Sequence, residues 1–153
     1  MIRILFVCHG NICRSPMAEF MMKDMVEKAG LEKQVSIRSA ATSSEEIGNG
    51  VYPPARRLIT EHGMDCSEKT ARKLRKDDYM AYDLLIGMDE ANLSNMRKIF
   101  GGDPDHKLHL LLDFTDRPEN IPDPWYTRDF EGAWDAIQRG CAALLDKIKK
   151  KEI

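Results

Sequence analysis

A cysteine and an arginine six positions apart lie near the amino terminus, in the segment Cys8-His9-Gly10-Asn11-Ile12-Cys13-Arg14-Ser15-Pro16. A cysteine thiolate is a strong nucleophile. A guanidinium group presents a planar fork that binds two oxygens of a phosphate at once. The pair therefore predicts attack by Cys8 on a phosphate that Arg14 holds. A structural Cys8 and a surface Arg14 are the alternative explanation of the same spacing.

The residues between them are suited to forming an anion-binding loop. A short loop that enters a helix turns its backbone N–H groups inward, and the helix N-terminus adds partial positive charge. Gly10 allows a tight turn, and Asn11 can adopt a left-handed backbone angle or brace the loop through its side chain. Ser15 can donate a hydrogen bond to the Cys8 thiolate. The predicted phosphate-binding residues are Cys8, His9, Gly10, Asn11, Ile12, Cys13 and Arg14.

A second segment supplies a candidate general acid. Cleavage of a phosphate ester requires a proton for the departing oxygen, and Asp123-Pro124-Trp125-Tyr126 offers a carboxyl group beside two aromatic side chains. Pro124 stiffens the backbone next to Asp123, and Trp125 and Tyr126 can wall a pocket for a flat ring. Taken alone, the segment could equally be an ordinary turn. Together with the first loop, it makes Cys8, Arg14 and Asp123 the predicted catalytic residues.

Strand-like and helical patterns alternate along the chain, which predicts an α/β fold with a parallel sheet. The strands are expected at residues 2–7, 35–39, 83–87 and 107–112. The helices are expected from Ser15-Pro16 to Gly30, from Pro53 to Gly63, over residues 89–100 and over residues 129–150. The last helix has one apolar face, which gives Trp134 and Cys141 structural roles. Such sheets bind ligands at the carboxyl ends of their strands, and Cys8 follows the first strand.

Composition excludes several classes of protein. The net charge is −2, which argues against a nucleic-acid-binding protein. No apolar run approaches a membrane span, and no signal peptide precedes the first strand, so we expect a cytoplasmic protein that does not bind membranes. The four cysteines are then expected to be reduced thiols. They lack the paired spacing of a zinc site, so no metal is predicted.

The motifs resemble those of the low-molecular-weight protein tyrosine phosphatases, over essentially the whole chain. The resemblance rests on Cys8-x5-Arg14-Ser15-Pro16, Ser39-Ala40-Ala41-Thr42-Ser43, Ala71-Arg72, Met88-Asp89-Glu90-x-Asn92-Leu93 and Asp123-Pro124-aromatic. It implies one phosphatase domain over residues 1–153, with a four-stranded parallel sheet flanked by helices on both faces and the phosphate loop after the first strand. It also implies hydrolysis of phosphotyrosine-containing proteins through a phosphocysteine, without a cofactor.

The resemblance further assigns supporting roles. Asn11, Ser15 and Ser39 would brace the loop, and the substrate cleft would be lined by His9, Ile12, Glu45, Trp125 and Tyr126. Two departures stand out. Lys69 occupies a position where many members carry a histidine linked to the bracing asparagine, and Glu45 and Glu46 make one side of the cleft acidic where some members have an aromatic residue.

Three other functions remain open on this scaffold. Protein arginine phosphatases carry threonine at the position of Ile12. Arsenate reductases need further cysteines to relay a disulfide, and this chain has none between Cys66 and Cys141. A non-catalytic phosphate-binding module would not need Cys8, Arg14 and Asp123 together. Within the loop, Cys13 could form a disulfide with an oxidised Cys8, or could be a small buried apolar residue. The sequence does not indicate an oligomeric state.

Overall fold

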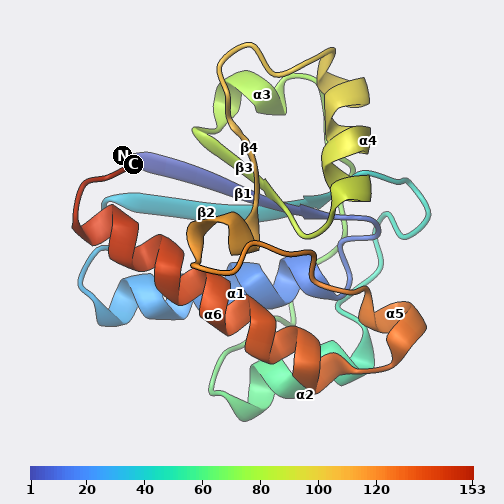
Figure 1. Cartoon of the computed structure of the whole chain (residues 1–153). Coiled ribbons are helices and arrows are strands. Elements are labelled where there is room, and N and C mark those ends of the chain that lie inside the picture. The colour runs from blue at the N-terminus through green and yellow to red at the C-terminus, as the bar shows by residue number, and fades with distance from the viewer.

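A four-stranded parallel sheet runs through the centre of the molecule (Figure 1). The structure is a computed structural model that describes all 153 residues. Its strands lie side by side in the order β2-β1-β3-β4. They are β1 (Ile2–Cys8), β2 (Val35–Ala41), β3 (Leu84–Gly87) and β4 (Leu108–Leu110). The buried, β-branched first strand is thus a central one, paired with β2 along its whole length and with β3 over four residues.

Helices cover both faces of the sheet, as the sequence predicts (Figure 1). One face carries α1 (Arg14–Lys28), α2 (Pro53–Glu61) and α6 (Phe130–Lys149), and the other carries α3 (Asp78–Ala81) and α4 (Glu90–Phe100). Side chains of β1 alternate between the two layers: Ile4 and Phe6 join the core under α1 and α6, whereas Leu5 and Val7 join the core under α4. Both sets are fully buried, which explains the continuous apolar run of β1.

Local sequence signals account for the ends of the later helices. Asp89 caps α4 in a reciprocal arrangement with Asn92, and Gly101 ends the helix in a left-handed conformation with φ of 78°. The predicted apolar face of α6 buries Trp134 and Cys141 in the core, so their structural roles are confirmed. Although α6 has 20 residues, neither it nor any other helix is both long and apolar enough to cross a membrane.

Several predicted boundaries are wrong. Strand β2 continues to Ala41, because it pairs with β1 up to Cys8. Strand β4 ends at Leu110, since the chain then turns into the 3₁₀ helix η1 (Leu111–Phe114). Helix α1 begins at Arg14, so Ser15 lies in the first turn rather than at the N-cap position. The short helices α3 and α5 (Pro124–Thr127) were not expected.

The strand order places the functional segments at one edge of the sheet. From β1 the chain passes through α1 to β2 on one side, and later through β3 and α4 to β4 on the other side. The connections therefore diverge between β1 and β3, and their carboxyl ends leave a crevice there. The loop after β1 contains Cys8 to Cys13, and the turn after β3 contains Asp89. This topology brings the two segments together.

The contact between α6 and η1 generates a prediction about stability. A Cβ atom on Gly140 would lie 2.5 Å from Cγ of the fully buried Leu111. Gly140→Ala should therefore overpack this contact and lower the free energy of unfolding by about 1–3 kcal/mol, although alanine is the better helix former. Urea denaturation of the variant and the wild type measures the difference.

The matched test removes the side chain that alanine would meet. Leu111→Ala alone should cost about 2–5 kcal/mol because it leaves a cavity. In that background Gly140→Ala should no longer destabilise the protein, since the added methyl group enters the vacated space. An equal penalty in both backgrounds would contradict the steric explanation.

Candidate active site

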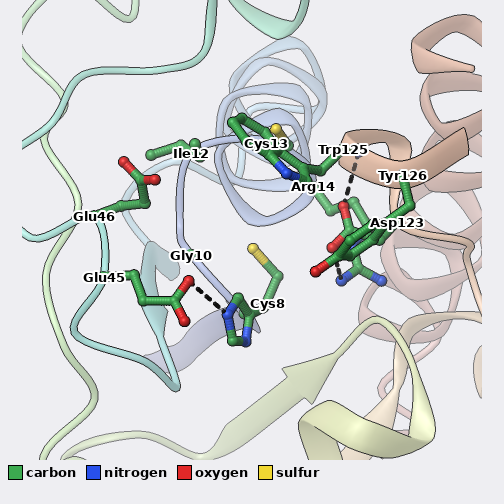
Figure 2. A pocket seen from close by; sticks show the side chains of 11 residues that line it. Cys8, Gly10, Ile12, Cys13, Arg14, Glu45, Glu46, Asp123, Trp125 and Tyr126 are labelled. Atoms are coloured by element: carbon green, nitrogen blue, oxygen red, sulfur yellow. Dashed lines mark hydrogen bonds and ion pairs between the residues drawn. The ribbon is translucent and has the colours of Figure 1, made fainter. Parts of the chain in front are cut away.

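One cavity collects all three predicted catalytic residues (Figure 2). It has a volume of about 100 Å³, is open to solvent, and has the Cys8 side chain at its base. The walls come from the loop after β1, from the segment after β2 and from α5. Its lining includes every predicted cleft residue and also Glu46: Cys8, His9, Gly10, Ile12, Cys13, Arg14, Glu45, Glu46, Asp123, Trp125 and Tyr126.

The loop after β1 offers a run of unpaired hydrogen-bond donors. The backbone N–H groups of residues 9–14 donate to no backbone acceptor, although carbonyls on either side of the site are used: Cys8 O accepts from Thr42 N and Ile12 O from Tyr52 N. Buried backbone donors are nearly always paired. A segment with this many free N–H groups, placed at the start of the 15-residue helix α1, is suited to hold an anion.

Asn11 holds this loop in shape. It has a left-handed backbone conformation with φ of 59°, which asparagine tolerates better than most residues. Its side-chain amide donates to Ser15 Oγ at 2.8 Å and to Ser39 Oγ at 2.9 Å, while its Oδ1 accepts from the backbone N–H of Arg72 at 3.2 Å. Asn11 is 1% exposed and lies behind the cavity rather than in its wall.

Ser15 connects this brace to the nucleophile. Its Oγ lies 3.0 Å from Cys8 Sγ. Because the Asn11 amide already donates to Ser15 Oγ, the serine hydroxyl proton is available for the sulfur atom. A hydroxyl donor at this distance can hydrogen-bond to the sulfur atom during the reaction. The geometry thus brings together Cys8, Ser15, Asn11 and Ser39, the predicted nucleophile and its three predicted supports.

Arg14 is buried and fixed before any ligand binds. Its Nη1 donates to Asp89 Oδ2 at 2.7 Å and to the carbonyl of Ile121 at 2.8 Å, and its Nη2 lies 3.4 Å from Asp123 Oδ2. Burial acts to lower the pKa of Arg14. The negative charges of Cys8, Asp89 and Asp123 outweigh that effect, so the pKa is raised above its ordinary value and the guanidinium stays charged.

Asp123 lies across the cavity from the loop, beside the Arg14 guanidinium (Figure 2). Its Oδ1 accepts from the backbone N–H of Trp125 at 3.0 Å and caps the short helix α5. The proline that follows it stiffens this turn. Trp125 packs against Tyr52, with ring centroids 4.8 Å apart, whereas Tyr126 is 78% exposed. The two predicted wall residues therefore differ: Trp125 is packed against Tyr52, whereas Tyr126 is largely exposed to solvent.

The rim of the cavity formed by Glu45 and Glu46 is acidic, and both carboxylates have a polar partner. His9 Nε2 lies 3.1 Å from Glu45 Oε2, and Asn49 donates to Glu46 at 2.6 Å. Glu46 also lies next to the phosphate loop, since a Cβ atom on Gly10 would be in ordinary van der Waals contact with its Cγ at 3.4 Å.

Comparison with known proteins identifies the family. Residues 3–153 match the family model described as low molecular weight phosphotyrosine protein phosphatase. The chain belongs to this family. The Bacillus subtilis protein named low molecular weight protein-tyrosine-phosphatase YfkJ is 35% identical, with 99% of each chain covered. Its crystal structure superposes with a TM-score of 0.95 over 100% of this chain and 98% of that chain.

Two further proteins are similar to this chain over nearly its whole length. The Drosophila melanogaster protein named low molecular weight phosphotyrosine protein phosphatase 1 is 38% identical over 97% of this chain and 98% of its own length. A crystal structure described as a Drosophila arginine phosphatase is 29% identical, has a TM-score of 0.87, and is covered over 97% of this chain and 98% of that chain. The predicted family and fold are thereby confirmed.

Several functional contacts of this phosphatase were not found from the sequence. Asp89, which we assigned only to a helix start, also holds Arg14. The backbone carbonyl of Ile121 and the ring of Tyr52 were not considered. Asp89 could have been found, because it follows the carboxyl end of β3, where ligand-binding residues of parallel sheets gather. Ile121 and Tyr52 left no such signal, since they act through a main-chain atom and through packing.

The brace at Lys69 differs from the family pattern. Lys69 does not contact Asn11, whose Oδ1 is occupied by the N–H of Arg72. Instead Lys69 Nζ donates to the backbone carbonyl of Ser39 at 3.1 Å and lies 3.7 Å from Glu19 Oε1. The loop of this phosphatase is therefore supported from Lys69 through Ser39.

Cys13 lines the cavity but is not a reactive thiol at neutral pH. Burial, together with the charges of Cys8 and Asp123, raises the pKa of Cys13 to about 12. Disulfide formation with a Cys8 sulfenic acid needs the Cys13 thiolate, which attacks the oxidised sulfur while the S–O bond breaks and the oxygen leaves as hydroxide, which takes a proton from solvent to become water. Below its pKa, the thiolate fraction grows about tenfold for each pH unit.

We therefore predict that any Cys8–Cys13 disulfide forms faster at higher pH. After one equivalent of hydrogen peroxide, the rate should rise about tenfold per unit between pH 7 and 9, because only the Cys13 thiolate attacks. Quenching with acid and mass spectrometry of the peptides measures it, with Cys13→Ala as the control that cannot form the bond. Overoxidation of Cys8 with Cys13 unmodified at every pH would contradict a resolving role.

Proposed function

We propose that this phosphatase hydrolyses phosphotyrosine and other aryl phosphates through a phosphocysteine, with Cys8 as nucleophile, Arg14 as phosphate clamp and Asp123 as general acid. The observation that carries this proposal is the placement of Cys8 Sγ at the base of a cavity beneath the free N–H groups of residues 9–14, with Arg14 and Asp123 beside it. On this reading residues 1–153 act as one phosphatase domain.

The first step transfers the phosphoryl group to sulfur. The N–H groups of residues 9–14 and the Arg14 guanidinium hold the three terminal oxygens of the phosphate dianion. The Cys8 thiolate attacks phosphorus from the side opposite the ester oxygen, the S–P bond forms and the P–O bond breaks. The Asp123 carboxyl group gives its proton to the departing oxygen, so the alcohol leaves uncharged.

The second step regenerates the enzyme. Ionised Asp123 accepts a proton from a water molecule, whose oxygen attacks phosphorus while the S–P bond breaks. Inorganic phosphate leaves, Cys8 returns as a thiolate, and Asp123 is again protonated for the next substrate. The Ser15 hydroxyl, 3.0 Å from Sγ, stabilises the thiolate as it departs.

The side walls support aryl esters of proteins as substrates. Ile12 is nearly buried and lines the cavity together with Trp125. An aliphatic side chain and an indole in the same wall suit the apolar faces of a phenyl ring. The free N–H groups of residues 9–14 lie in the loop at the base of the cavity, where the phosphate of an aryl ester would bind.

The role of Asp123 generates the test of this function. Asp123→Asn should lower kcat about 10²–10⁴-fold for phenyl phosphate, because phenolate is a poor leaving group that needs a proton. The loss should be much smaller for p-nitrophenyl phosphate, whose leaving group departs without help. Steady-state assays of both substrates measure the two ratios, with Cys8→Ser as the inactive control. Equal losses for both substrates would mean that Asp123 is not the acid.

Protein arginine phosphatase is the second candidate, since a Drosophila arginine phosphatase shares the fold. Ile12 speaks against it. Its side chain is 8% exposed at the cavity wall and offers no hydrogen-bond partner. A guanidinium beside it would lose water without replacement, at a cost that a phenyl ring does not incur.

Ile12 therefore predicts the preference between the two substrates. The wild type should hydrolyse phosphotyrosine with a higher kcat/KM than phosphoarginine, and Ile12→Thr should narrow or reverse that ratio, because threonine keeps the shape and adds a hydroxyl group. Ile12→Val, which removes one methylene without adding a polar atom, is the matched control. A wild type that prefers phosphoarginine, or a ratio that Ile12→Thr leaves unchanged, would contradict this assignment.

A further inference from the structure

A buried carboxylate lies behind the phosphate loop, outside the catalytic cavity. Glu19 is on α1 and is only 3% exposed. Its Oε1 accepts a hydrogen bond from Ser39 Oγ at 2.5 Å, and its Oε2 accepts one from Lys23 Nζ at 2.5 Å. A buried carboxylate is costly unless it is hydrogen-bonded and compensated by positive charge. Its position next to Ser39 connects it to the support of the nucleophile.

A series of hydrogen bonds runs from Glu19 through Ser39, Asn11 and Ser15 to Cys8, and the donor and acceptor of each bond are fixed. An ionised carboxylate only accepts, so the Ser39 hydroxyl must donate to Glu19. Ser39 Oγ then accepts from the Asn11 amide, whose orientation is set by the Arg72 N–H on its Oδ1.

The direction persists as far as the sulfur atom. The same Asn11 amide nitrogen donates to Ser15 Oγ at 2.8 Å, which leaves the Ser15 proton for Cys8 Sγ at 3.0 Å. Each polar hydrogen in this series of hydrogen bonds has one acceptor, and the last acceptor is the sulfur atom of Cys8.

Lys69 compensates Glu19 from the other side. Its side chain is 13% exposed, its Nζ lies 3.7 Å from Glu19 Oε1, and it donates to the backbone carbonyl of Ser39 at 3.1 Å. Lys23 also pairs with Glu19, but its side chain is 36% exposed and its charge is more strongly screened by water. Lys23 lies closer to Glu19, but Lys69 is the more buried cation and contacts both Glu19 and the Ser39 carbonyl.

We propose that the Glu19–Lys69 pair is a positioning device that keeps the Ser15 hydroxyl directed at Cys8. Without Lys69, only the more exposed Lys23 compensates Glu19, and the Ser39 carbonyl loses its donor. Ser39 is then held less firmly beneath the Asn11 amide, so Asn11 and the Ser15 hydroxyl that it supports lose their fixed positions. The less compensated Glu19 charge also opposes the Cys8 thiolate. This proposal rests on the proposed role of Cys8 as nucleophile.

The choice of lysine at position 69 affects how the charge beside Glu19 depends on pH. Burial lowers the pKa of Lys69, with the Glu19 charge acting against that effect. The charged groups around it are Glu19 and Lys23 on α1, Arg38 on β2, and Asp65, Glu68 and Arg72 on the loop that carries Lys69. An ordinary imidazole titrates near pH 6.5, and the Glu19 carboxylate would raise the pKa of a histidine at position 69 above that value. Such a histidine would still lose its charge at a lower pH than an ordinary lysine does. The wild type avoids such a transition.

The test measures thiolate formation and turnover separately. Neutral iodoacetamide alkylates the thiolate, and mass spectrometry of the Cys8 peptide gives the rate at each pH. Burial raises the pKa of the other three cysteines, Cys13, Cys66 and Cys141, so they react slowly. The second readout is kcat and KM for p-nitrophenyl phosphate over the same pH range.

Lys69→Met should move the midpoint of Cys8 alkylation up by about one pH unit and lower kcat/KM about tenfold. Lys69→Arg, which keeps the charge, should restore both to within about twofold of wild type. Lys69→His should resemble the wild type at low pH and approach Lys69→Met as the pH rises, with the Glu19 carboxylate moving this transition above the ordinary imidazole pKa of about 6.5. Lys28→Met is the matched control, because it removes an exposed ion pair with Asp24 on the same helix, and it should change neither readout.

Several outcomes would overturn the proposal. An alkylation profile that Lys69→Met leaves in place would remove Lys69 from the device. Lys69 would act only on stability if Lys69→Arg does not restore the lost kcat/KM and the pH profile of Lys69→His shows no additional ionisation. If Lys69→Met does not fold, the Cys8 alkylation rate and kcat/KM of Lys69→His at low and at high pH still show whether the charge at position 69 matters. Failure of the proposed function is distinct: the wild type would then not hydrolyse p-nitrophenyl phosphate, whereas alkylation needs no turnover.

Discussion

The backbone between Cys8 and Arg14 must stay open although its N–H groups have no partner, and the side chain of Asn11 holds it open. One amide group ties together the helix start through Ser15, the neighbouring strand through Ser39 and a distant loop through the Arg72 N–H. A loop free of this constraint would close and pair its donors internally, since unpaired buried donors are costly. The binding capacity of the site depends on this brace.

The same region lowers the stability of the fold. Arg14, Glu19 and Asn11 are at most 3% exposed, and each occupies a place where an apolar residue would cost less to bury. The surrounding core offsets this cost: the central strand β1 is packed by helices on both faces, and Phe6 is fully buried. Functional sites commonly carry such strain on a well-packed scaffold.

Local patterns predicted the parts of this structure that depend on neighbours in the sequence. The strand before Cys8, the loop up to Arg14 and the end of α4 before Gly101 follow from hydrophobic periodicity and from glycine, proline and capping preferences. Contacts across the chain were not predictable in this way. Asp89 meets Arg14 across 75 positions, and Lys69 meets the Ser39 carbonyl across 30. Such pairs depend on strand order, which no local pattern encodes.

The Arg14 guanidinium, held by Asp89 and the Ile121 carbonyl before any ligand arrives, loses almost no side-chain freedom when an oxyanion binds. The base of the site is therefore fixed in advance, whereas the rim is exposed: Trp125 is 42% and Tyr126 78% accessible to solvent. Substitutions at this exposed rim would leave the Arg14 anchor and its contacts in place.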